Sequence, residues 1–168
     1  MRLLIVRHAI AADHGTAGIS SDEERPLTPK GIRRFRQAAR GIVRLARPLD
    51  AIYTSPLVRT AETARLLAEA LGATLAPETA TVLAPGHEPA EVVRWLHGLE
   101  RDTRVALVGH EPGCSRLLSH LIGAHTGGSQ LEFKKGGAAM LELGDWPRSP
   151  RAVLLWFANP RLLRLAGR

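Results

Sequence analysis

Short apolar runs alternate along this chain with segments whose apolar residues recur at helical spacing. The pattern predicts strands at residues 2–6, 51–54, 104–108, 131–133, 138–143 and 152–157, and a weaker one at 81–83. Helices are expected after Thr28, after Ser55, around Val92 and from Gly113. Strands that alternate with helices are typical of α/β domains whose sheet is mostly parallel. We therefore expect one three-layer α/β/α sandwich over residues 1–168.

Two dipeptides mark the starts of the first helices. Thr28-Pro29 and Ser55-Pro56 each place a capping hydroxyl residue before a proline, which is the usual order at a helix N-terminus. The inward-facing positions expected on these helices and on the next two are Ile32, Phe35, Ala39, Ile42 and Leu45 or Ala46; Ala61, Ala64, Leu67, Ala68 and Leu71; Val92, Val93, Leu96 and Leu99; and Cys114, Leu117, Leu118, Leu121 and Ile122.

Two loops stand out. Residues 11–26 form a long polar connection after the first strand, and loops of that length in a compact domain usually have a function. A glycine-rich loop is expected at residues 123–128. The sequence contains neither an internal repeat nor a linker long enough to divide the domain.

The charge balance narrows the class of ligand. The 168 residues carry a formal net charge of +7, and only Lys30, Lys134 and Lys135 of the cationic residues are lysines. A positive field favours acidic ligands, whether a phosphorylated small molecule, a phosphoprotein or a nucleic acid. Trp95, Trp146 and Trp156 are not interleaved with a basic run, which argues against a stacking platform for nucleic acid.

Other compositional features concern the cellular setting. Cys114 is the only cysteine, so the chain has no disulfide framework and a reducing cytoplasm is the expected compartment. The first apolar run, residues 3–6, is too short for a signal peptide, and no stretch approaches the ~20 apolar residues of a membrane span.

Polar side chains that suit phosphate chemistry follow two of the predicted strands. Arg7 and His8 end the first strand, and Gly109-His110 ends the strand at 104–108. Ligands of open α/β sheets bind beyond the carboxyl ends of the strands. If these two strands are parallel neighbours, two imidazoles and one guanidinium meet at one edge of the sheet.

Two further arginines stand at helix starts. Arg59 lies in the first turn of the second helix, in the segment SPLVRTAETA at 55–64, and Arg25 precedes the first helix in RPLT at 25–28. Arginine offers a planar fork of N–H donors that matches the oxygens of a phosphate group. A helix N-terminus near Gly113 can add backbone N–H donors.

Together these motifs resemble the histidine phosphatase superfamily, in order and over the whole chain. The short length, the Arg-His-Ala-x-Ala opening, RPLT, Gly-His-x-Pro-Gly and Lys-Gly-Gly near the C-terminal strands resemble its SixA-type phosphohistidine phosphatases. The resemblance implies a phosphoglycerate mutase-like fold and a phosphatase that needs no cofactor. It implies His8 as the nucleophile that becomes phosphorylated, Arg7, Arg59 and His110 as catalytic partners, and Arg25 as a further substrate-binding cation.

One departure from the superfamily bears on the substrate. Many members carry a Glu or Asp that protonates the leaving oxygen, in the segment that here reads LAPGHEP at 83–89. His87 and Glu88 are the candidates there, and both are expected to be solvated loop residues. Without an acid, alkyl phosphate esters are poor substrates, whereas the imidazole of a phosphohistidine is protonated more easily. A protein phosphohistidine is therefore the expected substrate, and small phosphorylated metabolites are the alternative.

Other function classes find less support. A cysteine phosphatase needs an arginine six positions after its cysteine, and His120 stands there after Cys114. Cys114 is better explained as a small buried residue. The remaining histidines lack the spacing of metal ligands, so no metal site is expected. A non-catalytic module that binds phosphate or nucleic acid stays open, although such a module would not need an imidazole at His8.

Overall fold

The fold is a six-stranded sheet between two layers of helices. The computed structural model describes residues 1–16, 18–46, 48–100, 102–124, 131–144 and 152–168. The helices are α1 (Pro29–Ala46), α2 (Val58–Ala70), α3 (Pro89–Leu96), α4 (Gly113–Leu121) and α5 (Pro160–Ala166), and a short 3-10 helix, η1, spans Thr81–Leu83. The strands are β1 (Arg2–Arg7), β2 (Ala51–Thr54), β3 (Glu78–Thr79), β4 (Arg104–Gly109), β5 (Ala138–Leu143) and β6 (Ala152–Ala158).

The sheet is mostly parallel, as predicted. Its strand order is β3-β2-β4-β1-β5-β6. β1, β2, β3 and β4 pair in parallel, and β5 and β6 add an antiparallel edge. β1 lies in the middle, directly beside β4, so the carboxyl ends of these two strands meet at one edge of the sheet.

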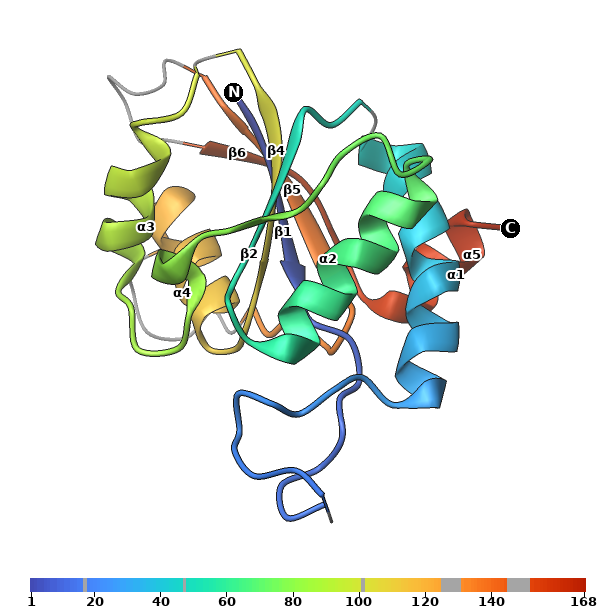
Figure 1. The fold of residues 1–168 in the computed structure, drawn as a ribbon. Coiled ribbons are helices and arrows are strands. Elements are labelled where there is room, and N and C mark those ends of the chain that lie inside the picture. The colour runs from blue at the N-terminus through green and yellow to red at the C-terminus, as the bar shows by residue number, and fades with distance from the viewer. Residues whose placement is uncertain (17, 47, 101, 125–130, 145–151) are drawn as a thin grey trace.

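Each face of the sheet has its own apolar core. Alternate residues of β1, Leu4 and Val6, pack with α1, α2 and α5, whereas Leu3 and Ile5 pack with α3 and α4. Figure 1 shows α1, α2 and α5 on one side of the sheet and α3 and α4 on the other. The predicted three-layer α/β/α architecture is confirmed.

The helix predictions hold, with corrections at single positions. Thr28 caps α1, because its Oγ1 accepts a hydrogen bond from the Gly31 amide at 3.0 Å. The inward position near the end of α1 is Ala46, since Leu45 is 49% exposed. Ala61 of α2 is exposed, contrary to expectation. α5 was not predicted, although Asn159 before Pro160 is an ordinary capping sequence and its Oδ1 accepts from the amides of Arg161 and Leu162.

Two strand predictions are wrong. Residues 81–83 form η1, and β3 lies three residues earlier. Residues 131–133 form no strand, because side chains bind the backbone of Phe133: its amide donates to Glu111 Oε1 at 2.6 Å, and its carbonyl accepts from Arg7 at 2.5 Å. Most of the glycine-rich loop expected at 123–128 lies outside the described residues, and so does Trp146.

Candidate active site

The two predicted histidines meet at the carboxyl ends of β1 and β4. Arg7 is in register with Gly109, and the His8 amide donates to the Gly109 carbonyl at 2.9 Å. The rings of His8 and His110 lie 5.3 Å apart between centroids, and both residues are buried. The expected meeting of imidazoles at one sheet edge is confirmed as geometry.

The His8 ring is held in one tautomer. Its Nδ1 lies 2.7 Å from the carbonyl oxygen of Ala9, which can only accept, so Nδ1 carries the proton and Nε2 carries the free electron pair. Burial is the main cause that lowers the pKa of His8, and the Ala9 bond opposes it. The charges of Arg59 and Arg7 also lower the pKa, and the net value is about 4. His8 is therefore neutral near pH 7, with a nucleophilic nitrogen at Nε2.

Ser55 orients His110 and does not cap α2. Its Oγ lies 2.8 Å from His110 Nε2, and the residue at the N-cap of α2 is Leu57, without a side-chain cap bond. Burial, with the nearby charge of His8, lowers the pKa of His110 to about 3. His110 Nδ1 is buried and has no partner within the part of the chain that the structure describes.

Arg7 and Arg59 reach the histidines from opposite faces of the sheet. Arg7 ends β1, whereas Arg59 lies in the first turn of α2 and has only 5% of its side chain exposed. Both guanidinium charges lower the pKa of His8. Arg7 Nε and Arg59 Nε are buried without a partner among the described residues, as is His110 Nδ1. A buried donor without an acceptor is costly, so this group of three nitrogens fits an anion.

Asp22 is a site residue that sequence reasoning missed. The loop that leaves β1 brings it against Arg59, whose Nη1 donates to the Asp22 backbone carbonyl at 2.6 Å and whose Nη2 donates to Asp22 Oδ2 at 2.9 Å. Burial raises the pKa of Asp22, but hydrogen bonds from Arg25 and Arg59 outweigh it and the net pKa lies below its usual value. Asp22 is thus an ionised carboxylate inside a cationic site.

Arg25 binds the loop. Its Nε and Nη2 lie 2.8 and 2.7 Å from Asp22 Oδ1, and its Nη1 donates to the Ala12 carbonyl at 2.7 Å. Arg25 therefore reaches Arg59 through Asp22. A direct contact between Arg25 and substrate stays a prediction.

A tight turn before β5 is fixed to the backbone of the site. The Gly136 amide donates to the carbonyls of His8 and Arg7, and the Arg7 amide donates to the Gly137 carbonyl. Gly136 has a φ of +81°, a conformation that side chains rarely adopt. The charge of Lys135, on this turn, also lowers the pKa of His8.

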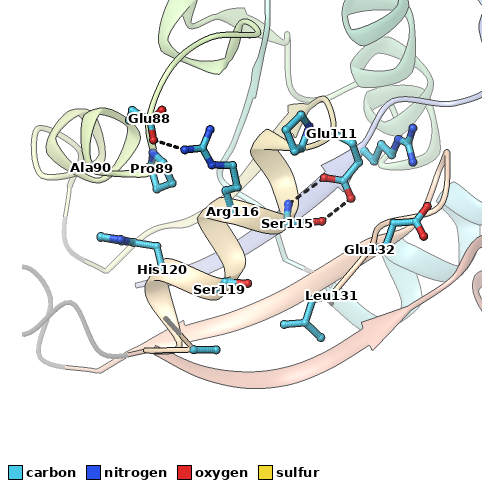
Figure 2. Close-up of a pocket in the computed structure, with 13 residues that line it drawn as sticks. Glu88, Pro89, Ala90, Glu111, Ser115, Arg116, Ser119, His120, Leu131 and Glu132 are labelled. Carbon is cyan, nitrogen blue, oxygen red and sulfur yellow. Dashed lines mark hydrogen bonds and ion pairs between the residues drawn. The ribbon is translucent and has the colours of Figure 1, made fainter. Parts of the chain in front are cut away.

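The carboxylates near the expected acid position have other partners. Glu88 and His87 are exposed, as predicted, and Glu88 pairs with Arg116 at 2.5 Å. Glu111 accepts from the Ser115 hydroxyl and amide, so it caps the start of α4 and occupies donors that were expected to be free for a ligand. Figure 2 shows these contacts. They line a surface groove of about 760 Å³ along α4, which the start of α3, Leu131 and Glu132, and Arg7 also line.

Three further predictions concern groups outside the cluster of histidines and arginines. Cys114 is buried on α4, and burial raises the pKa of its thiol beyond the range of a reactive thiolate. Within the described ranges, no three His, Cys, Asp or Glu side chains are placed to hold a metal ion. No helix among the described residues is long and apolar enough to cross a membrane.

Comparison with known proteins connects this geometry to a family. A family model described as histidine phosphatase superfamily (branch 1) matches residues 3–83. An uncharacterised protein of Picosynechococcus sp. is 36% identical over 147 residues, which cover 86% of each chain.

Solved structures share the fold. The protein histidine phosphatase SixA in complex with tungstate is 24% identical, with a TM-score of 0.82 over 97% of this chain and 99% of that one. A phosphoserine phosphatase of Entamoeba histolytica, in complex with 3-phosphoglyceric acid, is 16% identical, with a TM-score of 0.68 over 94% of this chain and 96% of that one. At these identities the neighbours establish the shared fold, and the enzymes named differ from one another in substrate. The chain belongs to the histidine phosphatase superfamily.

Proposed function

We propose that this protein is a phosphatase that transfers a phosphoryl group from its substrate to His8 and then to water. The proposal rests on three buried nitrogens that have no partner among the described residues, Arg7 Nε, Arg59 Nε and His110 Nδ1. They accompany a neutral imidazole, His8, whose free Nε2 is a nucleophile. Phosphoryl transfer needs an in-line nucleophile and fixed positive charge around the three equatorial oxygens. These residues supply both.

The reaction has two steps. His8 Nε2 attacks phosphorus, so that an N–P bond forms while the bond to the leaving group breaks and that group departs with the electron pair and gains a proton. Water then attacks the phosphohistidine, the N–P bond breaks, and inorganic phosphate is released. In both steps Arg7 and Arg59 bind the phosphoryl oxygens, and His110, oriented by Ser55, donates from Nδ1.

We propose that no metal ion or other cofactor takes part. The two guanidinium groups supply the positive charge that a metal ion supplies in many other phosphatases. A chelator such as EDTA should leave the rate unchanged. A rate that falls in EDTA and returns with a divalent cation would overturn this part of the mechanism.

The proposed substrate is a phosphohistidine on another protein, in a cytoplasmic setting. Asp22 is held ionised by arginines, and Glu88 and Glu111 are paired elsewhere, so none of these three carboxylates is a proton donor for a leaving group. That favours a substrate whose leaving group is protonated readily, such as imidazole. The open groove beside Arg7 leaves room for a protein surface, and the shared fold with SixA agrees. Small phosphate esters are the second candidate, because the phosphoserine phosphatase shares this fold too.

The decisive experiment tests whether phosphate becomes attached to His8 during turnover. The protein is mixed with a radiolabelled phosphohistidine protein or with 4-nitrophenyl phosphate and quenched during turnover. We expect acid-labile, alkali-stable label on His8, and a loss of about 10³-fold or more in rate for His8→Ala. An unlabelled protein that binds phosphate without hydrolysis would support the non-catalytic binding module instead. Faster hydrolysis of sugar phosphates or nucleotides than of the phosphoprotein would favour the small-molecule reading.

A further inference from the structure

The contact between Asp22 and Arg59 leaves one edge of the guanidinium unoccupied. A guanidinium group has two edges that can form paired hydrogen bonds, an end-on edge made by Nη1 and Nη2 and a side-on edge made by Nε and Nη2. Asp22 occupies the end-on edge, since its backbone carbonyl accepts from Nη1 and its Oδ2 accepts from Nη2. Nε, on the other edge, is buried without a partner among the described residues.

We propose that Asp22 is a positioning residue that holds Arg59 by its end-on edge and turns the side-on edge toward the phosphoryl group on His8. The inference rests on the proposed function and adds a residue to it. Asp22 does not itself touch the reacting atoms.

Burial explains why Arg59 needs such a partner. The Arg59 side chain is 5% exposed, so water does not hydrate its charge, and a buried cation without a paired anion is strongly unfavourable. Asp22 supplies that anion while it remains 39% exposed on the loop. Two contacts from one residue, one from its backbone and one from its side chain, also fix the plane of the guanidinium. A single carboxylate contact would leave the plane free to rotate.

The second oxygen of Asp22 ties this arrangement to the loop. Oδ1 accepts from Arg25 at 2.7 and 2.8 Å, and Arg25 also donates to the Ala12 carbonyl, so the carboxylate bridges two cations. His14 Nε2 lies 3.1 Å from the same oxygen at an exposed position. The loop thus presents Asp22 at a fixed place.

An inhibitory role for Asp22 would need a different geometry. A carboxylate that imitates phosphate would occupy the edge that phosphate uses, and would have to leave before substrate binds. Here the edge with the unpartnered buried nitrogen is the one that Asp22 leaves open. Substrate can therefore bind while Asp22 stays in place.

The test is a comparison of Asp22→Ala and Asp22→Asn with the wild-type protein in two assays, 4-nitrophenyl phosphate hydrolysis and the binding of inorganic phosphate by calorimetry. We expect Asp22→Ala to lower kcat/KM by about 10- to 100-fold, the size of effect that a misplaced catalytic group produces. Asp22→Asn keeps the backbone carbonyl and one side-chain oxygen, and should lose less. Both variants should bind phosphate more weakly.

A double-mutant cycle separates positioning from simple anchoring of the loop. In an Arg59→Lys background, whose ammonium has no second edge to orient, Asp22→Ala should change kcat/KM by less than about threefold. If the loss in kcat/KM of the double variant equalled the product of the two single losses, the proposal would be overturned, because Asp22 would then act independently of Arg59. Tighter phosphate binding or faster hydrolysis in Asp22→Ala would overturn it in favour of inhibition.

Asp13→Asn is the matched control. It removes one negative charge from the same loop, and the described residues show no contact with its side chain, so activity should stay within about twofold of wild type. If the wild-type protein hydrolyses no phosphate ester, the proposed function fails. The phosphate-binding cycle still tests Asp22 in that case: equal affinity of Asp22→Ala and wild type would refute the positioning role.

Discussion

The two halves of the site are built in different ways. His8 and His110 follow directly on β1 and β4, and backbone hydrogen bonds fix them on both sides. Asp22 and Arg25 lie on the long loop after β1, where they are held by side-chain contacts with one another and with Arg59. The histidines are 7% and 5% exposed, whereas the Asp22 side chain is 39% exposed.

This difference indicates that the two halves have different roles. The atoms proposed to react lie on the most constrained part of the fold, since the central strands of a sheet move least and an in-line reaction tolerates little displacement. The loop carries the groups that adjust the charge and orientation of Arg59. Loops are also where related enzymes differ in function, so the loop half is the place to expect adaptation to a substrate.

The largest expected effect concerns protonation in the strand half. Burial should keep His8 and His110 neutral, with titration midpoints near 4 and 3 in place of the usual 6.5. At pH 6 the charged fraction of His8 should then be about one per cent, compared with about three quarters for an unperturbed histidine. Histidine ring signals in NMR spectra recorded from pH 3 to pH 8 measure both midpoints.

The same shifts predict how stability depends on pH. In the unfolded chain both histidines take up protons as the pH falls through about 6.5, whereas in the folded chain His8 does so only near pH 4 and His110 only near pH 3. The free energy of unfolding should therefore fall as the pH drops from about 6.5 toward 4, and these residues should add nothing to its pH dependence above 7. A His8 signal that titrates at 6.5 or higher would contradict the neutral nucleophile.

The next effect compares an arginine of each half. Arg59→Lys keeps the charge but loses the side-on edge, and should cost about 2 kcal/mol of transition-state stabilisation, or about 30-fold in kcat/KM. Arg25→Lys keeps an ammonium near Asp22 and should cost less than about fivefold, because Arg25 acts through that carboxylate. Steady-state kinetics of both variants give the ratio of the two losses in kcat/KM. Equal losses in kcat/KM would mean that Arg25 binds the phosphoryl group directly.

The sequence predicted the strand half because its signals are local. An apolar run that ends in Arg7-His8, and another that ends in Gly109-His110, place these side chains at strand ends once the fold class is known. Arg59 was found in the same way, from its place one turn into a helix. The parallel register of β1 and β4 then brings them together.

In the loop half, Arg25 was named from the RPLT motif, but Asp22 could not be predicted, since its contact with Arg59 joins distant residues. Asp22 is one of several acidic residues in a polar loop, and only the tertiary structure sets it against Arg59, 37 positions away. Ser55 is a second case: it is a good capping residue, but its side chain binds His110. Phe133 is a third, because its backbone binds the side chains of Glu111 and Arg7 and does not form the predicted strand. In each case a long-range polar contact outweighed a local preference.

The smallest expected effect tests whether an acid has been missed outside both halves. Without a proton donor, hydrolysis should depend steeply on the leaving group, so that 4-nitrophenyl phosphate reacts far faster than an alkyl phosphate. Glu88→Gln removes the exposed carboxylate that pairs with Arg116, and the ratio of the aryl to the alkyl rate should change by less than about twofold. Glu111→Gln weakens the cap of α4 and should lower both rates together, so the ratio of the aryl to the alkyl rate should also stay unchanged. If either variant slowed the alkyl ester selectively, that carboxylate would be the proton donor, and small phosphate esters would become the better candidate substrates.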